Sequence, residues 1–301
     1  MIVKVGIIFD VKLEFLQDVI NIFKDKNVSL PTPDTSLSDR EVTIRVIVPF
    51  DEKVNYYTII EIYQYLETHL QVKDIAERYY FEFSNEEYAK APFFILQSPG
   101  NSQSAFLKDK GTDYKNEIYC ENCGLIIQHQ QSPLVIDTSI IKSRYLVNVG
   151  AHWVVSEKMA ALMYNWGLSG YELKEVLHKG PEKGKQPAYQ IVPTATFPKW
   201  SQEMKPYYFY TEKDRICKSC GIKGLINGAY LYNREDLLDL NNDIYVTHEF
   251  SHDWKYVYSP TILSKKFRDL IIEHKITKDI RGIDDPRYGS KDWLLDPIIV
   301  L

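Results

Sequence analysis

CENCG at residues 120–124 and CKSCG at residues 217–221 are two copies of one pattern, Cys-x-x-Cys-Gly, and they contain every cysteine of the chain. Two cysteines separated by two residues can point at one ion, because the chain turns tightly between them. The glycine that follows each pair suits the positive φ with which a chain often leaves such a turn. In a reducing compartment, cysteines used in this way indicate metal binding rather than disulfides.

The two motifs predict one zinc ion bound by the thiolates of Cys120, Cys123, Cys217 and Cys220. Zinc favours four tetrahedral ligands, and thiolate is among its best. Four protein ligands leave no position for water or substrate, so we expect a structural zinc and not an enzyme that uses this metal. The long segment between the motifs does not oppose a shared site, since loop-closure entropy grows only logarithmically with length. Two alternatives stay open: a redox-active pair, which calls for one Cys-x-x-Cys at a helix start, and two separate or degenerate sites.

Each motif is followed by a segment that resembles its counterpart. VVSEKMAALMYNWGLSGYEL (154–173) follows the first motif, and TILSKKFRDLIIEHKITKDI (261–280) follows the second. When Ser156 is aligned with Ser264, the two segments share Ser-x-Lys and then apolar residues at helical spacing. Each segment predicts a strand that runs into a serine N-cap, a helix of about three turns, and a short exit strand. We therefore expect two related strand–helix units that share one four-cysteine zinc.

The first hundred residues have a different pattern, in which strands alternate with helices. Period-two alternation or a short apolar run predicts the strands, and apolar residues at helical spacing predict the helices. The expected strands are residues 2–8, 41–50, 78–83 and 92–97, and the expected helices are residues 12–24 and 56–70. A loop at residues 98–104 suggests a boundary near residue 105. The predicted fold is α+β, with an α/β module of unknown role in residues 1–105 and a double Cys-x-x-Cys-Gly domain in residues 106–301.

Composition narrows the classes of partner. The chain has 301 residues, 45% of them apolar, which suffices for one large domain or two of ordinary size. Its net charge of −5 provides no overall basic field for phosphate backbones or anionic lipid, so we expect no membrane or nucleic-acid partner from it; an acidic surface would suit a basic protein partner. No apolar run approaches the ~20 residues that span a bilayer. The N-terminal residues lack the features of a signal peptide, and we expect a cytoplasmic protein.

His248-Glu249-Phe250-Ser251-His252 spells the His-Glu-x-x-His motif of zinc metalloproteases. In those enzymes the two histidines lie one helical turn apart and bind zinc, while the glutamate activates water; Glu273 would be the candidate third ligand here. The surrounding DIYVTHEF (243–250) alternates like a strand, however, and a strand would separate the histidines by about 13 Å. We interpret the segment as a surface strand and turn, with the metalloprotease as an alternative.

The order and spacing of these features resemble the double-CXXCG motif family, whose members occur as paralogues in myxobacteria. The resemblance covers roughly residues 115–283 and includes both cysteine motifs, the strand–helix element at 153–173, the step Asp243-Ile244-Tyr245 and the final strand–helix at 261–276. The chain departs from the family at Glu121 and Lys218, where the family usually has a proline after the first cysteine.

Some members of that family are described as immunity proteins, which protect a cell from a toxin exchanged between kin. The resemblance implies an antitoxin that binds a cognate toxin and neutralises it by occlusion, with no catalytic residues of its own. No phosphate loop, nucleophile elbow or dinucleotide fingerprint is found in the sequence, in agreement with that expectation. A nucleic-acid-binding zinc protein remains an alternative, because Arg215, Lys218 and Lys223 surround the second motif; these cations could equally offset the −2 charge of a zinc tetrathiolate.

Overall fold

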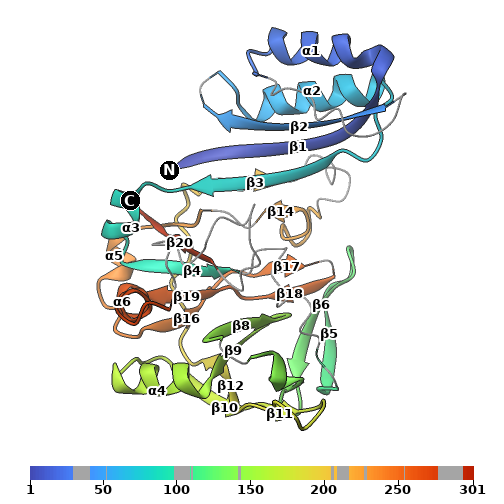
Figure 1. Cartoon of the computed structure of the whole chain (residues 1–301). Helices are drawn as coiled ribbons and strands as arrows, with labels where there is room; N and C mark the ends of the chain where they lie inside the picture. The colour runs from blue at the N-terminus through green and yellow to red at the C-terminus, as the bar shows by residue number, and fades with distance from the viewer. Residues whose placement is uncertain are drawn as a thin grey trace. The chain divides into compact units, whose positions relative to one another are not determined.

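The structure is a computed structural model, and it describes residues 1–29, 41–51, 53–97, 109, 111–141, 144–204, 207–208, 217–226, 229–253, 255–276 and 294–301. Within these ranges the protein is a mixed α+β structure with many short strands and few helices (Figure 1), which confirms the predicted class. The chain divides into two compact units, Met1–Ser84 with Pro206–Gly228, and Asn85–Lys205 with Ala229–Leu301. The loop at 98–104, where a boundary was expected, lies outside the described residues. Among the described residues, no helix is both long enough and apolar enough to cross a membrane.

The first unit contains a three-stranded sheet of order β2-β1-β3, in which both neighbouring pairs are antiparallel. Its strands are β1 (Ile2–Lys12), β2 (Glu41–Phe50) and β3 (Ala76–Glu82). Its helices are α1 (Leu16–Asp25), which follows a 3-10 turn η1 (Leu13–Phe15), and α2 (Tyr56–Thr68). The strands and helices predicted for this segment are confirmed, with ends that shift by a few residues. A short ladder of β13 (Tyr207–Tyr208) and β14 (Leu225–Ile226) also belongs to this unit.

Alternating apolar residues hold this unit together. One face of β2 is buried at every second residue, from Val42 to Val48, as the period of a half-exposed strand requires. These side chains pack in one core with the buried faces of α1 and α2, including Phe23 and Ile62. Asn55 begins α2, where its side chain accepts a hydrogen bond from the Thr58 amide at 3.1 Å.

The second unit contains three four-stranded sheets among its described residues, of orders β16-β19-β4-β20, β10-β12-β9-β8 and β17-β18-β6-β5. The first sheet consists of β4 (Phe93–Gln97), β16 (Ile244–Val246), β19 (Thr261–Ser264) and β20 (Leu294–Pro297). The second consists of β8 (Leu146–Val149), β9 (His152–Ser156), β10 (Tyr171–Glu175) and β12 (Ala188–Pro193). The third consists of β5 (Tyr114–Cys120), β6 (Leu125–Gln130), β17 (Ser251–Asp253) and β18 (Tyr256–Tyr258).

Shorter elements complete this unit. Two parallel two-stranded ladders are formed by β7 (Val135–Ile136) with β11 (Leu177–His178), and by β15 (Leu231–Tyr232) with β21 (Ile299–Val300). The helices are α3 (Asn85–Lys90), α4 (Glu157–Asn165), α5 (Arg234–Leu237) and α6 (Lys265–Glu273), with a 3-10 turn η3 (Thr138–Ile140).

The two strand–serine–helix segments predicted from the sequence are present and begin in the same way. β9 runs through Ser156 into α4, and β19 runs through Ser264 into α6. Both serines are extended, with φ of −70° at each, and each side chain accepts the amide hydrogen of the third residue onward at 3.3 Å. The serine N-caps are therefore confirmed.

The two helices also end alike. Gly167 (φ 59°) and Lys275 (φ 51°) both adopt the left-handed conformation after the last turn. The next amide then bonds back to the helix, from Leu168 to Met163 at 3.1 Å and from Ile276 to Ile271 at 3.0 Å. β10 confirms the exit strand of the first segment, whereas residues 277–280 of the second lie outside the described residues.

Asp243 connects these two segments. Its buried carboxylate accepts a hydrogen bond from the Ser264 hydroxyl at 2.6 Å and from the Ser169 amide at 3.0 Å. The helix ends also meet directly, because the Trp166 indole N–H donates to His274 Nε2 at 3.0 Å. The strand–helix segments therefore pack as a pair around one buried carboxylate.

Candidate metal centre

The first cysteine motif lies at the turn between β5 and β6. Cys120 is the last residue of β5, and the Gly124 amide donates to the Cys120 carbonyl at 2.9 Å, which closes a tight turn. Gly124 has φ of +70°, and a Cβ placed there would meet no atom within 4 Å. The glycine is therefore favoured by its backbone conformation and not by lack of space.

The second motif repeats this geometry ahead of β14. The Gly221 amide donates to the Cys217 carbonyl at 2.8 Å, and Gly221 has φ of +67° with open space at its Cβ. In both motifs the first cysteine is buried, with 7% of Cys120 and 8% of Cys217 exposed, and the second is half-buried. The glycine after each pair thus has the role expected from the sequence.

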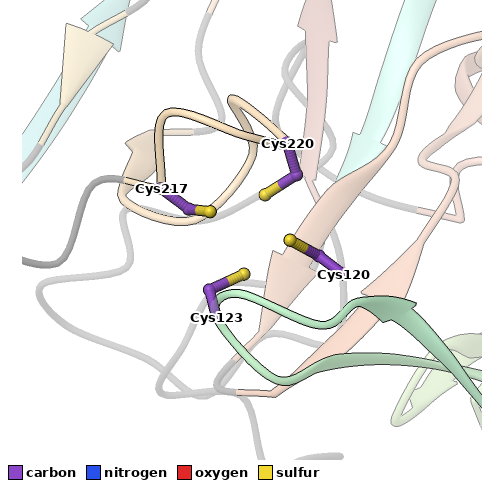
Figure 2. A group of neighbouring side chains, drawn as sticks. All are labelled: Cys120, Cys123, Cys217 and Cys220. Carbon is purple, nitrogen blue, oxygen red and sulfur yellow. The ribbon is translucent and has the colours of Figure 1, made fainter.

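The four cysteine sulfurs all lie within 4.8 Å of one another, and all four thiols are free (Figure 2). Figure 2 shows the four side chains converging from two loops on one point. A tetrahedral ion with bonds of 2.3 Å to sulfur would place the sulfurs about 3.8 Å apart. The sulfurs are close enough for Cys120, Cys123, Cys217 and Cys220 to coordinate one metal ion.

This is the one group of three or more histidine, cysteine, aspartate or glutamate residues, within the described ranges, that could hold a metal ion. The donors are four sulfurs and no carboxylate or imidazole. Such a set matches the soft, closed sites that zinc or iron occupies in proteins, and not the open sites at which metals activate water.

The His-Glu-x-x-His motif lies on no helix. The strand expected over residues 243–250 is shorter than predicted, because β16 ends at Val246. There the Thr247 side chain donates to the Glu249 carbonyl at 2.6 Å and turns the chain, and β17 begins afterwards at Ser251.

The two histidines and the glutamate of this motif each lie in a local structural environment. Glu249 Oε1 accepts a hydrogen bond from the Trp200 amide at 2.9 Å and lies 3.8 Å from His248 Nδ1. His252 belongs to β17, opposite Val257. The geometry lacks the helical turn that brings both histidines of a metalloprotease onto one ion. Glu273, the candidate third ligand, is exposed at the end of α6.

Of the basic residues around the second motif, Arg215 lies outside the described residues, Lys218 is exposed and Lys223 is half-buried.

A polar network in the second unit was not foreseen from the sequence. His152 lies at its centre. The Tyr114 hydroxyl oxygen is 3.0 Å from His152 Nε2, and the Gln190 amide nitrogen is 3.1 Å from His152 Nδ1. Gln190 and Gln130 in turn exchange two amide hydrogen bonds, at 2.8 and 3.1 Å. The Tyr114 hydroxyl also contacts the Asp109 carboxylate. These residues come from separate strands and loops, so no spacing in the sequence marks them.

Burial sets the protonation of this network. Desolvation lowers the pKa of His152, and the Asp109 carboxylate opposes that shift in part. Desolvation, followed by the bond to Asp109, raises the pKa of the Tyr114 hydroxyl. Both groups are therefore neutral near pH 7.

Comparisons of this chain with models of protein families, with curated proteins and with solved structures find no match.

Proposed function

We propose that this protein is an immunity-type antitoxin that binds a cognate toxin and neutralises it by occlusion, and that a zinc ion held by Cys120, Cys123, Cys217 and Cys220 stabilises its fold. The proposal of a metal site rests on one observation: the sulfur atoms of the four cysteines lie within 4.8 Å of one another. The toxin-binding part rests on the resemblance of the cysteine motifs and strand–helix segments to the double-CXXCG family.

Zinc is the metal we assign, because a four-thiolate set suits it and a reducing cytoplasm keeps the ligands as thiols. Such a site would be structural, since its four protein ligands complete the coordination. Structural zinc can contribute on the order of 10 kcal/mol to folding, which is comparable with the whole stability of a typical domain. Metal content and stability should therefore be lost together.

Elemental mass spectrometry of the purified protein tests the metal. We expect one zinc per chain, absent from a Cys217→Ala/Cys220→Ala double variant that also loses stability. Lys218→Ala is the matched control, because Lys218 lies in the same turn, is exposed and is no ligand. A metal-free wild-type protein would refute the site, and a second zinc that survives in the double variant would point to His248, Glu249 and His252.

Growth protection tests the antitoxin function. Each gene next to the one that encodes this protein would be expressed alone and together with it. We expect one neighbour to arrest growth, the wild-type protein to restore it, and the double cysteine variant to fail. If no neighbour is toxic, or if the toxic product is not neutralised, the antitoxin proposal is wrong even where the zinc is present.

A further inference from the structure

The strand β5 lies at the edge of its sheet, whose order is β17-β18-β6-β5. Among the described residues no strand pairs with the outer side of β5, and its residues from Lys115 to Ile118 are all exposed. An edge strand presents backbone N–H and C=O groups that its own sheet does not bond, so it can pair with a strand of another chain. The outer side of residues 114–118 is called the β5 edge below.

One backbone hydrogen bond shows which residues of β5 bond to β6. The Gln131 amide donates to the Asp113 carbonyl at 2.8 Å, and these two residues lie opposite one another, one step before the first register pair of the two strands. In an antiparallel ladder, bonded and non-bonded pairs of opposite residues alternate. The backbone groups of Lys115 and Glu117 are therefore directed at β6.

A bond on the other side of β6 agrees with this pattern. The Ile126 amide donates to the Lys255 carbonyl at 2.8 Å, beside β18, so Ile126 does not bond to its opposite residue in β5, which is Ile118. The N–H and C=O groups of Tyr114, Asn116 and Ile118 thus point away from β6. These three residues provide the hydrogen-bonding groups of the β5 edge.

The direction of these groups selects the register in which two copies of the edge can pair. A two-fold axis places one residue opposite itself, and that residue must point its backbone groups outward. If Tyr114 were central, half of the pairing would lie before the strand begins, and if Ile118 were central, it would run into the bulge between Ile118 and Cys120. With Asn116 central, the pairing lies within β5 and before the bulge.

In this register the side chains of the two copies are complementary. Lys115 lies opposite Glu117 of the second copy on one face of the sheet, and the symmetry repeats this pair. On the other face Ile118, which is 64% exposed, lies opposite Tyr114 of the second copy. Pairs of opposite charges and pairs of an aromatic with a β-branched residue both stabilise antiparallel sheets. A lysine usually discourages pairing at an edge, but here its charge meets a carboxylate.

We propose that the β5 edge pairs with the same edge of a second copy of this chain, antiparallel and centred on Asn116. The pairing joins two four-stranded sheets into one sheet of eight strands. Each bonded pair of opposite residues exchanges two hydrogen bonds, as in any antiparallel ladder. The paired segment is short, so the dimer is weaker than those with interfaces of standard size. This proposal rests neither on the metal nor on the antitoxin function.

Sedimentation velocity of the full chain, at concentrations from about 1 to about 500 µM, tests the proposal. We expect a reversible monomer–dimer equilibrium with a dissociation constant of about 10–100 µM. Asn116→Pro should abolish the dimer and leave the far-ultraviolet circular dichroism unchanged, because it removes an N–H that points outward and is not used by β6. A protein that stays monomeric at about 500 µM overturns the proposal.

Charge reversal tests the register. Lys115→Glu and Glu117→Lys each turn both cross-strand ion pairs into pairs of like charge, so each variant should dimerise at least about tenfold more weakly. In an equimolar mixture of the two variants, a mixed dimer has opposite charges at both pairs. The mixture should therefore dimerise about as tightly as the wild-type protein, which a loss of folding in either variant would not allow.

The matched controls are Lys183→Glu and Glu172→Lys, which change the net charge by the same amounts at exposed residues outside β5. We expect both to dimerise like the wild-type protein. The proposal is overturned if the β5 variants and the controls dimerise alike, since the dimer would then use another surface. It is also overturned if the mixture of Lys115→Glu and Glu117→Lys does not restore the dimer.

Discussion

Replacing Ser264 and Ser156 by alanine, one at a time, compares the same change in two helix caps that differ in one contact. Both serines are nearly buried, at 7% and 8% exposed, and both cap their helices with a bond of 3.3 Å. Loss of the cap costs typically about 1 kcal/mol, and it applies equally to the two variants. The small cavity left by the lost hydroxyl oxygen also contributes about equally to both variants, since the side chain and its burial match.

The remaining difference is the bond from Ser264 to Asp243. The Ser264 hydroxyl donates to Oδ1 of this buried carboxylate at 2.6 Å, whereas the Ser156 hydroxyl bonds to no carboxylate within the described ranges. Hydrogen bonds to charged groups contribute about 1.5–3 kcal/mol. We therefore expect Ser264→Ala to lower the free energy of unfolding by about 2.5–4 kcal/mol, against about 1 kcal/mol for Ser156→Ala.

Urea unfolding of the zinc-loaded protein, followed by tryptophan fluorescence and by far-ultraviolet circular dichroism, measures both values. Coincident transitions would show that the two variants report on one cooperative unit. A double-mutant cycle with Asp243→Asn isolates the contact, and we expect a coupling energy of about 1.5–3 kcal/mol with Ser264 and near zero with Ser156. We assign the larger effect of Ser264→Ala to its hydrogen bond with Asp243. Equal losses of unfolding free energy in the two serine variants, or equal coupling energies with Asp243, would refute that assignment.

Three further predictions concern the pair Gly124 and Gly221, Gly170, and His152. Gly124→Ala and Gly221→Ala should each lower the free energy of unfolding by about 1–2 kcal/mol, because alanine is strained at φ near +70°, and the two costs, measured by urea unfolding, should agree. Gly170→Ala should cost more than either in the same assay, since its φ is +83° and a Cβ there would lie 2.4 Å from the Ile244 carbonyl oxygen; a cost equal to that of Gly124→Ala would contradict the contact. Because burial lowers the pKa of His152 below its ordinary 6.5, its neutral form contributes stability that is complete above pH 6.5 and is lost as the pH falls through and below that value. The difference in unfolding free energy between the wild-type protein and His152→Gln should therefore shrink between pH 7.5 and about pH 5, and a difference independent of pH would show that His152 is not held neutral.

The local elements could be predicted because their signals lie within a dozen residues. The alternation in β1 and β2, and the apolar spacing in α1 and α2, are visible without any partner. The serine caps were found in the same way, since a cap requires only the serine and the amide three residues onward. The antiparallel pairing of β1 with both β2 and β3 could not be foreseen, because alternation of strands and helices along the chain does not fix strand direction.

The four-cysteine cluster could be predicted because cysteines are rare and each pair has a fixed local spacing. Each Cys-x-x-Cys-Gly turn is defined by its own glycine and by one backbone bond, so the sequence specifies half a site at a time. With every cysteine used in two such halves, convergence on one point was the simplest expectation, and the four thiols do converge. The sequence could not give the metal, because thiolate sets of this kind also suit iron.

The HEFSH segment shows the limit of a periodic pattern. A strand forms as expected over Ile244, Tyr245 and Val246. It ends there, and the hydroxyl of the next residue, Thr247, donates a hydrogen bond to the Glu249 carbonyl. Threonine favours strands in general, and its side chain competes with the sheet for backbone groups only where the local chain can turn back. That choice depends on the tertiary contacts of the next residues, which the pattern does not contain.

Asp243 and the His152 network were hidden for a related reason. A single aspartate, glutamine or histidine in a strand or loop is expected at the surface until its partners are known. Here β4 pairs with β19 and β20 from the far end of the chain, and β12 pairs with β9 and β10. These pairings bury Asp243 and Gln190, and burial then requires that their polar atoms be satisfied by other side chains.

The arrangement of the four cysteines bears on the stability of the chain. The cysteine centre has its four donors directed at one point, and a bound ion would leave it no free position, so it is suited to holding the chain together. We therefore expect removal of a bound ion to lower the free energy of unfolding of the protein, and the same loss in the Cys217→Ala/Cys220→Ala variant.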